Sequence, residues 1–138
     1  MANPSSKVKE VPEEYRFPNS IQVRGALKIP SNRGLTASAV QTQVGATALI
    51  PGPNIVTTCA TAGNAVRLPL LNTDDDLGTM CIVANLGVAT CQVFPGTSAT
   101  IKGGAANAVD AVQIAANGAR TYILNKIGAV YNWDPIGF

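Results

Sequence analysis

From Gly34 onward the chain consists of short runs rich in Val, Ile, Thr and Ala, separated by Gly, Pro, Asn and Asp. β-Branched residues favour strands, whereas Gly, Pro, Asn and Asp favour tight turns. The runs recur about every 8 to 12 residues, the spacing typical of a sandwich or barrel. The sequence therefore predicts an all-β fold, a β-sandwich or barrel-like domain of about eight to ten short antiparallel strands.

The runs also give approximate strand positions. Candidate strands are residues 36–43, 47–50, 54–61, 65–68, 80–84, 89–94, 99–102, 108–115, 120–124 and 130–133. Asn117-Gly118 lies between two of these runs and predicts a hairpin, because Asn-Gly tolerates the positive φ angles of a type I′ turn. Residues 105–119 are rich in alanine, so a helix there is the main alternative.

The first quarter of the chain differs in composition from the rest. Residues 1–33 contain six basic and three acidic residues and four prolines, whereas residues 34–138 contain four basic and five acidic residues. Proline removes a backbone donor and disfavours helix at the residue before it. We therefore expect an extended N-terminal arm over residues 1–33 and a β-domain over residues 34–138. Candidate partner-contact residues on the arm are Val8, Val11, Tyr15, Arg16, Phe17 and Ile21.

Composition argues against most kinds of catalysis. The chain has no histidine, which is the commonest general base and metal ligand, and only 13% of its residues are charged. It has no glycine-rich phosphate loop, nucleophile elbow or zinc-protease motif. A net charge of +2 is too small to indicate nucleic acid or a membrane as a partner. We therefore expect a protein that is not an enzyme and has no cofactor.

Three features leave smaller alternatives open. Cys59, Cys81 and Cys91 form an odd set without a CxxC pair, so we expect reduced, buried thiols. Asp74-Asp75-Asp76 is interpreted as a solvated turn, with a cation site as the alternative. Paired carboxylates for glycoside hydrolysis would require Asp110 or Asp134 to meet this turn. The aromatic residues Tyr122, Tyr131, Trp133 and Phe138 are expected in the core or an interface, with a sugar-binding platform as the alternative.

Several segments together carry a resemblance to a known group of proteins. They are Gly45-Ala46-Thr47-Ala48-Leu49, Val66-Arg67-Leu68-Pro69, Asn85-Leu86-Gly87 followed by Val93-Phe94-Pro95, Ile101-Lys102-Gly103, and Tyr131-Asn132-Trp133. In this order they resemble small β-rich structural proteins of tailed bacteriophages, known as head decoration, cement or virion structural proteins. The resemblance covers about residues 44–133. This chain departs from the pattern at residues 70–78, which form a longer, acidic turn.

The resemblance implies a non-enzymatic capsid decoration protein that binds the outside of the phage head and stabilises it. Its implied partners are the major capsid protein and copies of itself, as a trimer or, second, a dimer. Its implied location is the virion, assembled in the host cytoplasm. One alternative is a tail- or fibre-associated module that recognises the host surface. A further alternative is a small carbohydrate-binding or hydrolytic β-domain.

Overall fold

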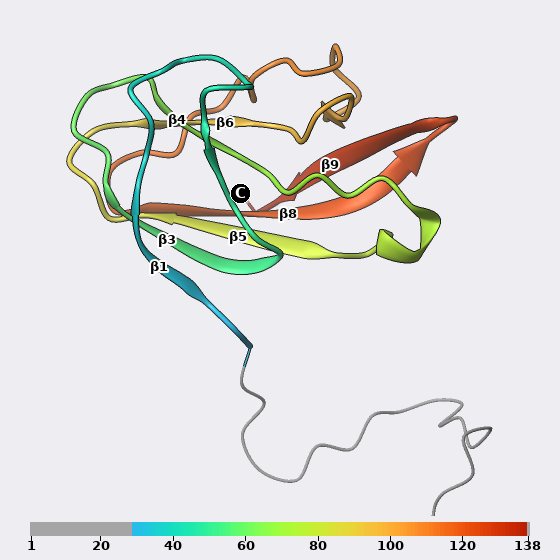
Figure 1. The fold of residues 1–138 in the computed structure, drawn as a ribbon, viewed down its shortest axis with the longest axis horizontal. Helices are drawn as coiled ribbons and strands as arrows, with labels where there is room; N and C mark the ends of the chain where they lie inside the picture. The colour runs from blue at the N-terminus through green and yellow to red at the C-terminus, as the bar shows by residue number, and fades with distance from the viewer. Residues whose placement is uncertain (1–28, 138) are drawn as a thin grey trace, which may run out of the picture.

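The computed structural model describes residues 29–137, and these residues form two β-sheets (Figure 1). The larger sheet has six strands in the order β1-β3-β5-β8-β9-β7, and the smaller has three in the order β2-β4-β6. The strands are β1 (Asn32–Thr36), β2 (Thr47–Ala48), β3 (Gly52–Thr58), β4 (Asn64–Arg67), β5 (Met80–Asn85), β6 (Cys91–Phe94), β7 (Thr100–Ile101), β8 (Gly118–Ile127) and β9 (Val130–Ile136). One short 3₁₀ turn, Asp74–Asp76, interrupts them. In this part of the chain no helix is long and apolar enough to cross a membrane.

The first six strands form a parallel coil. The chain alternates between the sheets, so that β1 and β2 make a first rung, β3 and β4 a second, and β5 and β6 a third. Within each sheet, successive rungs pair in parallel. Leu35 thus lies beside Val56, and Thr47 lies beside Val66. A three-rung β-solenoid results, in which residues about 20 to 30 positions apart become neighbours.

The core lies between the two sheets of the coil. Val56, Val66, Val83 and Val93 have no exposed surface, because alternate side chains of each strand point inward. In the smaller sheet Val66 lies beside Val93 of the next rung, whereas in the larger sheet Val56 lies beside Asn85 and Val83 beside Asn54. The coil is therefore held together by the same apolar periodicity that predicted its strands.

The three thiols belong to this core. Cys59, Cys81 and Cys91 are free and buried, which confirms the expectation that they are unpaired. Burial raises the pKa of Cys81 to about 12, and burial together with the neighbouring Cys59 raises the pKa of Cys91 to about 12. These thiols are therefore protonated at neutral pH.

A hairpin closes the third rung. β8 pairs antiparallel with β5 and with β9, and β7 adds to β9 in parallel. The hairpin brings Tyr122, Leu124 and Trp133 into the core, where each is at most 1% exposed. At this end the larger sheet continues beyond β5, whereas β6 stays an edge strand of the smaller sheet with a single bridge from Cys91 to Ile114. β1 and β2 are the edge strands at the other end.

The expectation of antiparallel strands is only partly correct, because the sheets are mixed and five of the seven strand pairings are parallel. Alternation along one strand shows which side chains are buried, but it does not show the direction of the neighbouring strand. The strand-rich fold itself is confirmed. The predicted boundary at residues 33 and 34 falls within β1, and the rest of the predicted arm lies outside the described residues.

Three local expectations are wrong. Residues 36–43 belong mainly to the connection after β1, and residues 108–115 form neither a strand nor the alternative helix. Asn117 does adopt a positive φ of 58°, but no hairpin forms there because the preceding segment is irregular. The actual hairpin turns at Gly128, whose φ is 60°, between β8 and β9.

Candidate functional site

The contact residues predicted on the arm, Val8, Val11, Tyr15, Arg16, Phe17 and Ile21, lie outside the described residues. A candidate site must therefore be sought between residues 29 and 137. We considered the acidic turn, the aromatic and carboxylate groups, and the ends of the coil in turn.

The acidic turn is held by its own contacts. Thr73 and Asp76 form a capping box, in which the Asp76 carboxylate accepts from the Thr73 backbone amide at 3.2 Å; it also accepts from the Thr73 hydroxyl at 2.8 Å. Asp74 accepts from Lys126 Nζ at 2.6 Å and from the Tyr131 hydroxyl at 3.0 Å. These hydrogen bonds, first that from Lys126, lower the pKa of Asp74. No group of three or more Cys, Asp or Glu side chains suited to a metal ion occurs in the described chain.

The groups considered for sugar chemistry are used structurally. Tyr122 and Trp133 are buried in the core, so neither belongs to a surface platform, and the half-buried Tyr131 donates its hydroxyl to Asp74. Phe138 lies outside the described residues. The Asp134 carboxylate accepts hydrogen bonds from Asn125 and Asn132. Neither Asp110 nor Asp134 shares a hydrogen-bond partner with the acidic turn.

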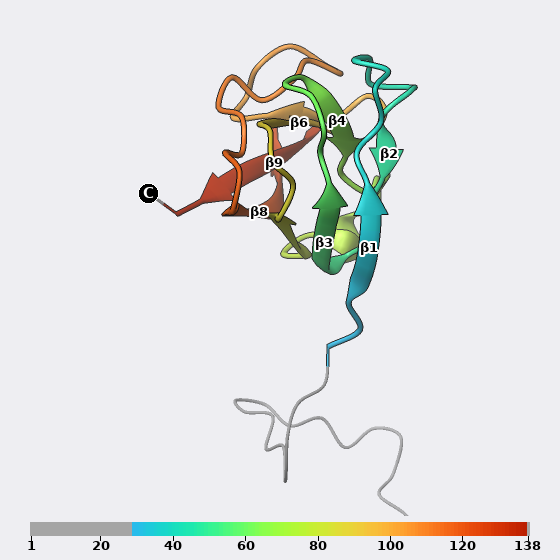
Figure 2. The same cartoon turned by 90° about the vertical axis from the view of Figure 1, so that its left-hand side faces the viewer.

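The remaining candidate is one end of the coil, which we call the turn end. It comprises residues 37–46, 59–63 and 86–90, which connect the two strands of each rung, and residues 111–117, which precede β8. Figure 1 shows these connections gathered on the left, and Figure 2 shows the same end facing the viewer. The coil thus brings four separate segments onto one face.

The turn end carries no charged residue. It does carry exposed apolar side chains, with Val44 81% and Val88 85% exposed. Val40, Leu86 and Val112 add three more, each at least half exposed. An open groove lined by Val112, Arg120 and Ile136, among others, adjoins this surface.

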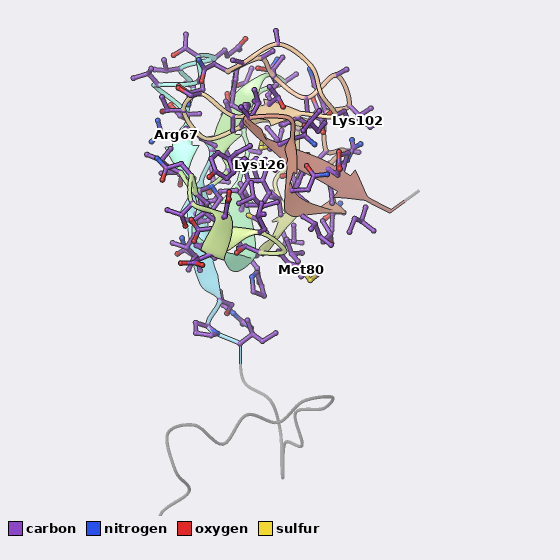
Figure 3. The ribbon with its side chains drawn as sticks, turned by 90° about the vertical axis from the view of Figure 1, so that its right-hand side faces the viewer. Arg67, Met80, Lys102 and Lys126 are labelled. Atoms are coloured by element: carbon purple, nitrogen blue, oxygen red, sulfur yellow. The ribbon has the colours of Figure 1, made fainter. Side chains whose placement is uncertain are left out.

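Charged side chains concentrate at the opposite end. Figure 3 views the molecule from that side and labels Arg67, Lys102 and Lys126 on it. The acidic turn lies there too, since Asp74 and Lys126 form an ion pair. The described part of the molecule is therefore polarised: apart from the Asp110–Arg120 ion pair, which adjoins residues 111–117, the turn end is uncharged.

A buried asparagine fixes two of the turn-end segments. Asn85, at the end of β5, is fully buried. Its side-chain amide donates to the carbonyls of Ala89 at 2.8 Å and of Ile114 and Ala115 at 3.1 Å, and its oxygen accepts from the Gly87 amide at 3.0 Å. One side chain thus ties residues 86–90 to residues 111–117.

An ion pair behind residues 111–117 holds the same segment. The Asp110 carboxylate lies 3.4 Å from Arg120 Nη1 and accepts from the Tyr122 hydroxyl at 2.9 Å. Asp110 also accepts from the Val112 amide, and Arg120 donates to the Val112 carbonyl. Burial, followed by the charge of Asp110, raises the pKa of Tyr122, so its hydroxyl remains a donor. These groups form a positioning network, and their charges are satisfied within it.

The stacking of neighbouring turns is close. A Cβ atom on Gly87 would lie 2.4 Å from the Cys59 backbone nitrogen, so only glycine fits against the turn of the second rung. The turn end is therefore a preformed surface with a tightly packed backbone, and its chemistry is that of an uncharged contact face.

Comparison with protein-family models, with curated proteins and with solved structures gave no match. The turn end was missed by sequence reasoning because its segments are far apart in the chain. The sequence feature that could have indicated this surface is the lack of charged residues between Arg33 and Arg67 and between Asp76 and Lys102, two long intervals in a chain of 138 residues.

Proposed function

We propose that this chain is a non-enzymatic structural protein of a bacteriophage virion, a capsid decoration protein that binds the outside of the head and stabilises it. The observation that carries the proposal is the uncharged turn end with its exposed valines. The order of segments that resembles small phage structural proteins supports the same assignment.

An uncharged, apolar surface is suited to contact with another protein. Its burial avoids the cost of removing charges from water. Fully burying one large aliphatic side chain contributes about 1.5 to 3 kcal/mol, so Val40, Val44, Leu86 and Val88 together provide a substantial contact. On a symmetric shell, each such contact is repeated at every equivalent position, and small individual free energies accumulate.

The predicted arm contributes the second part of the attachment. In this proposal Val8, Val11, Tyr15, Phe17 and Ile21 bury apolar surface on the major capsid protein, and Arg16 adds charge. Charge mainly affects the association rate and its salt dependence, whereas burial determines most of the affinity. Copies of the chain associate with one another on the shell, as a trimer in our first choice and a dimer in our second.

The turn end is tested by a double substitution, Val44→Asp with Val88→Asp, which places two charges on the proposed contact surface. The matched control is Ile127→Asp with Val130→Asp, because these side chains are also exposed but lie at the tip of the β8–β9 hairpin. Undecorated heads of the phage that encodes the chain are mixed with each variant and sedimented. We expect the first variant to lose most of its binding and the control to keep it.

If both variants bind the heads equally well, the turn end is not part of the contact surface. Gold-labelled antibodies on intact particles give a separate test of location, for which the proposal expects labelled heads. Labelled tails would instead favour the host-recognition alternative, and absence of label from purified particles would contradict the virion assignment.

Deleting residues 1–20 tests the arm. We expect a β-domain with a similar melting temperature that no longer decorates heads. If the shortened protein still saturates the heads, the β-domain alone carries the binding. If it fails to fold, the proposed domain boundary is wrong.

A further inference from the structure

The outer face of the larger sheet is apolar across the four neighbouring strands β3, β5, β8 and β9. Alternate residues of a strand point to opposite sides of a sheet, and residues paired across strands point to the same side. The inward set includes Val56, Val83 and Tyr122, which are fully buried in the core. The outward set has as its larger members Pro53, Ile55, Met80, Ile82, Ile123 and Ile136. Aliphatic side chains therefore continue from one strand to the next on this face.

This outer face keeps contact with solvent in the described structure. None of its larger side chains is fully buried within residues 29–137, and Met80 and Ile136 are each 46% exposed. Figure 3 labels Met80, whose side chain projects from the body of the molecule. Asp134 is the one charged residue on the outward side of these four strands, and its carboxylate accepts hydrogen bonds from Asn125 and Asn132. The face therefore presents aliphatic groups and almost no charge.

The outer face of the smaller sheet differs in both respects. Ala65 is fully buried there and Phe94 is only 7% exposed, because they pack with Ala46 from the connection before β2. The same face carries the charged Arg67, which pairs with Phe94. The chain thus covers the outer face of its smaller sheet with its own residues. A sheet face that meets water normally carries polar side chains, so the aliphatic outer face of the larger sheet indicates a further contact.

We propose that two copies of this chain pack face to face through the outer faces of their larger sheets and form a symmetric dimer. A second copy fits for two physical reasons. Sheets of the same twist pack well on each other at about 30°, and a second copy has the same twist by identity. A face that is nearly free of charge meets its own copy without repulsion between like charges, and a twofold contact uses the same patch on both partners.

The size of the face sets the strength of the contact. Four strands about 4.8 Å apart, with about six residues each at about 3.4 Å, cover about 400 Å² in projection. Projecting side chains such as Met80 increase the accessible area, so two faces together bury about 1,000 Å², the lower limit for a specific interface. We therefore expect a dimer whose population depends on protein concentration.

The dimer leaves the turn end accessible. The outer face lies along the side of the coil, whereas the turn end lies at the end of the coil, where its strands are connected (Figures 1 and 2). Both surfaces can therefore be used at the same time. The inference deepens the proposed association between copies, of which it selects the dimer, and it does not rest on the virion assignment.

Sedimentation equilibrium of the full chain over a wide concentration range is the first test. We expect the molar mass to rise from 14.2 kDa toward twice that value. Met80→Lys places a charge from each copy in the contact, so the dimer dissociation constant should rise at least about tenfold. The matched control is Val88→Lys, because Val88 is 85% exposed but belongs to the turn end. We expect the control to keep the dissociation constant of the unmodified chain, and thermal unfolding confirms that both variants fold.

Oxidation of Met80 is a second test that needs no substitution. A peroxide transfers one oxygen atom to the thioether, which becomes the sulfoxide, and the peroxide is reduced to water or an alcohol. Mass spectrometry measures the rate at Met80 against free methionine added to the same solution. We expect oxidation of Met80 to be at least about threefold slower at concentrations where the dimer predominates than in the monomer.

Four results would overturn the proposal. One is a monomer at every concentration, and another is a dimer that Val88→Lys weakens as much as Met80→Lys does. A third is a Met80 oxidation rate that is slow at every concentration, since a segment of the same chain would then cover the face. The fourth is a rate that stays fast while the dimer forms, which would place the contact elsewhere. These measurements use no phage particles, so a failure of head binding leaves this inference standing, and the reverse also holds.

Discussion

Replacing Asn85 by alanine should destabilise the protein and loosen the turn end. The Asn85 side chain makes four hydrogen bonds, but the four partners are not equally dependent on it. The Ile114 carbonyl also accepts from the Cys91 amide, and the Ala115 carbonyl also accepts from the Gly118 amide. These two carbonyls therefore keep a partner after the substitution.

In the described structure the Gly87 amide and the Ala89 carbonyl have no hydrogen-bond partner other than the Asn85 side chain. Gly87 is buried, and a buried group left without a partner costs about 1 to 3 kcal/mol, whereas Ala89 is only partly buried; the expected loss is therefore at least about 1 to 3 kcal/mol. Total stabilities of small domains are about 5 to 15 kcal/mol. The substitution should therefore remove a large part of the free energy of unfolding.

Urea unfolding followed by circular dichroism measures the change directly. Asn72→Ala is the matched control, because Asn72 is exposed, and we expect it to change stability by less than about 0.5 kcal/mol. Hydrogen exchange should speed up in residues 86–90 and 111–117 of Asn85→Ala before the rest of the domain. A loss below about 0.5 kcal/mol for Asn85→Ala would refute the assignment of this side chain as the link between the two segments.

Three further outcomes are expected. Gly87→Ala should lower the melting temperature markedly, because its Cβ atom would lie 2.4 Å from the Cys59 backbone nitrogen; an unchanged melting temperature would show that the turns are not tightly stacked. Cys81 should not react with a thiol reagent at pH 8 until the protein unfolds, because burial raises its pKa to about 12; fast labelling of the folded protein would contradict this. The pKa of Asp74 in the folded protein is lowered by Lys126, so this contact stabilises the fold at neutral pH and is lost as the pH falls through that pKa. An NMR titration should therefore show the Asp74 pKa rising in Lys126→Ala, and no rise would exclude the contact.

The sequence predicted the strands better than their partners. The runs at residues 47–50, 54–61, 65–68 and 80–84 each overlap a strand of the structure. The direction of pairing was missed because two strands of one rung belong to different sheets. The rungs differ in length, since Thr47 pairs 19 positions further on and Val66 pairs 27 positions further on. Unequal connections hide the repeat from any search for a fixed period.

The segment at residues 108–115 shows why a strand-like pattern can mislead. Val109, Val112 and Ile114 gave it an apolar content typical of a strand, yet only Ile114 is buried among them. The segment is held instead by Asp110, whose carboxylate is satisfied by Arg120 and Tyr122. A buried acid with distant partners leaves no local signal in the sequence, so the connection was predicted as a strand.

The turn end could not be predicted from the sequence for the same reason as the parallel strand pairing: both depend on how the chain winds into a coil. A coil places every connection between its two sheets at one end or the other, so residues far apart in the chain share a face. Val44 and Val88 belong to different rungs, and neither stands in a recognisable motif. A short uncharged turn is unremarkable alone, whereas a stack of them makes a continuous surface without charge. The lack of charge on which the proposed partner binding rests therefore arises from the winding of the chain, and a substitution such as Val88→Asp tests the stacked surface rather than a local motif.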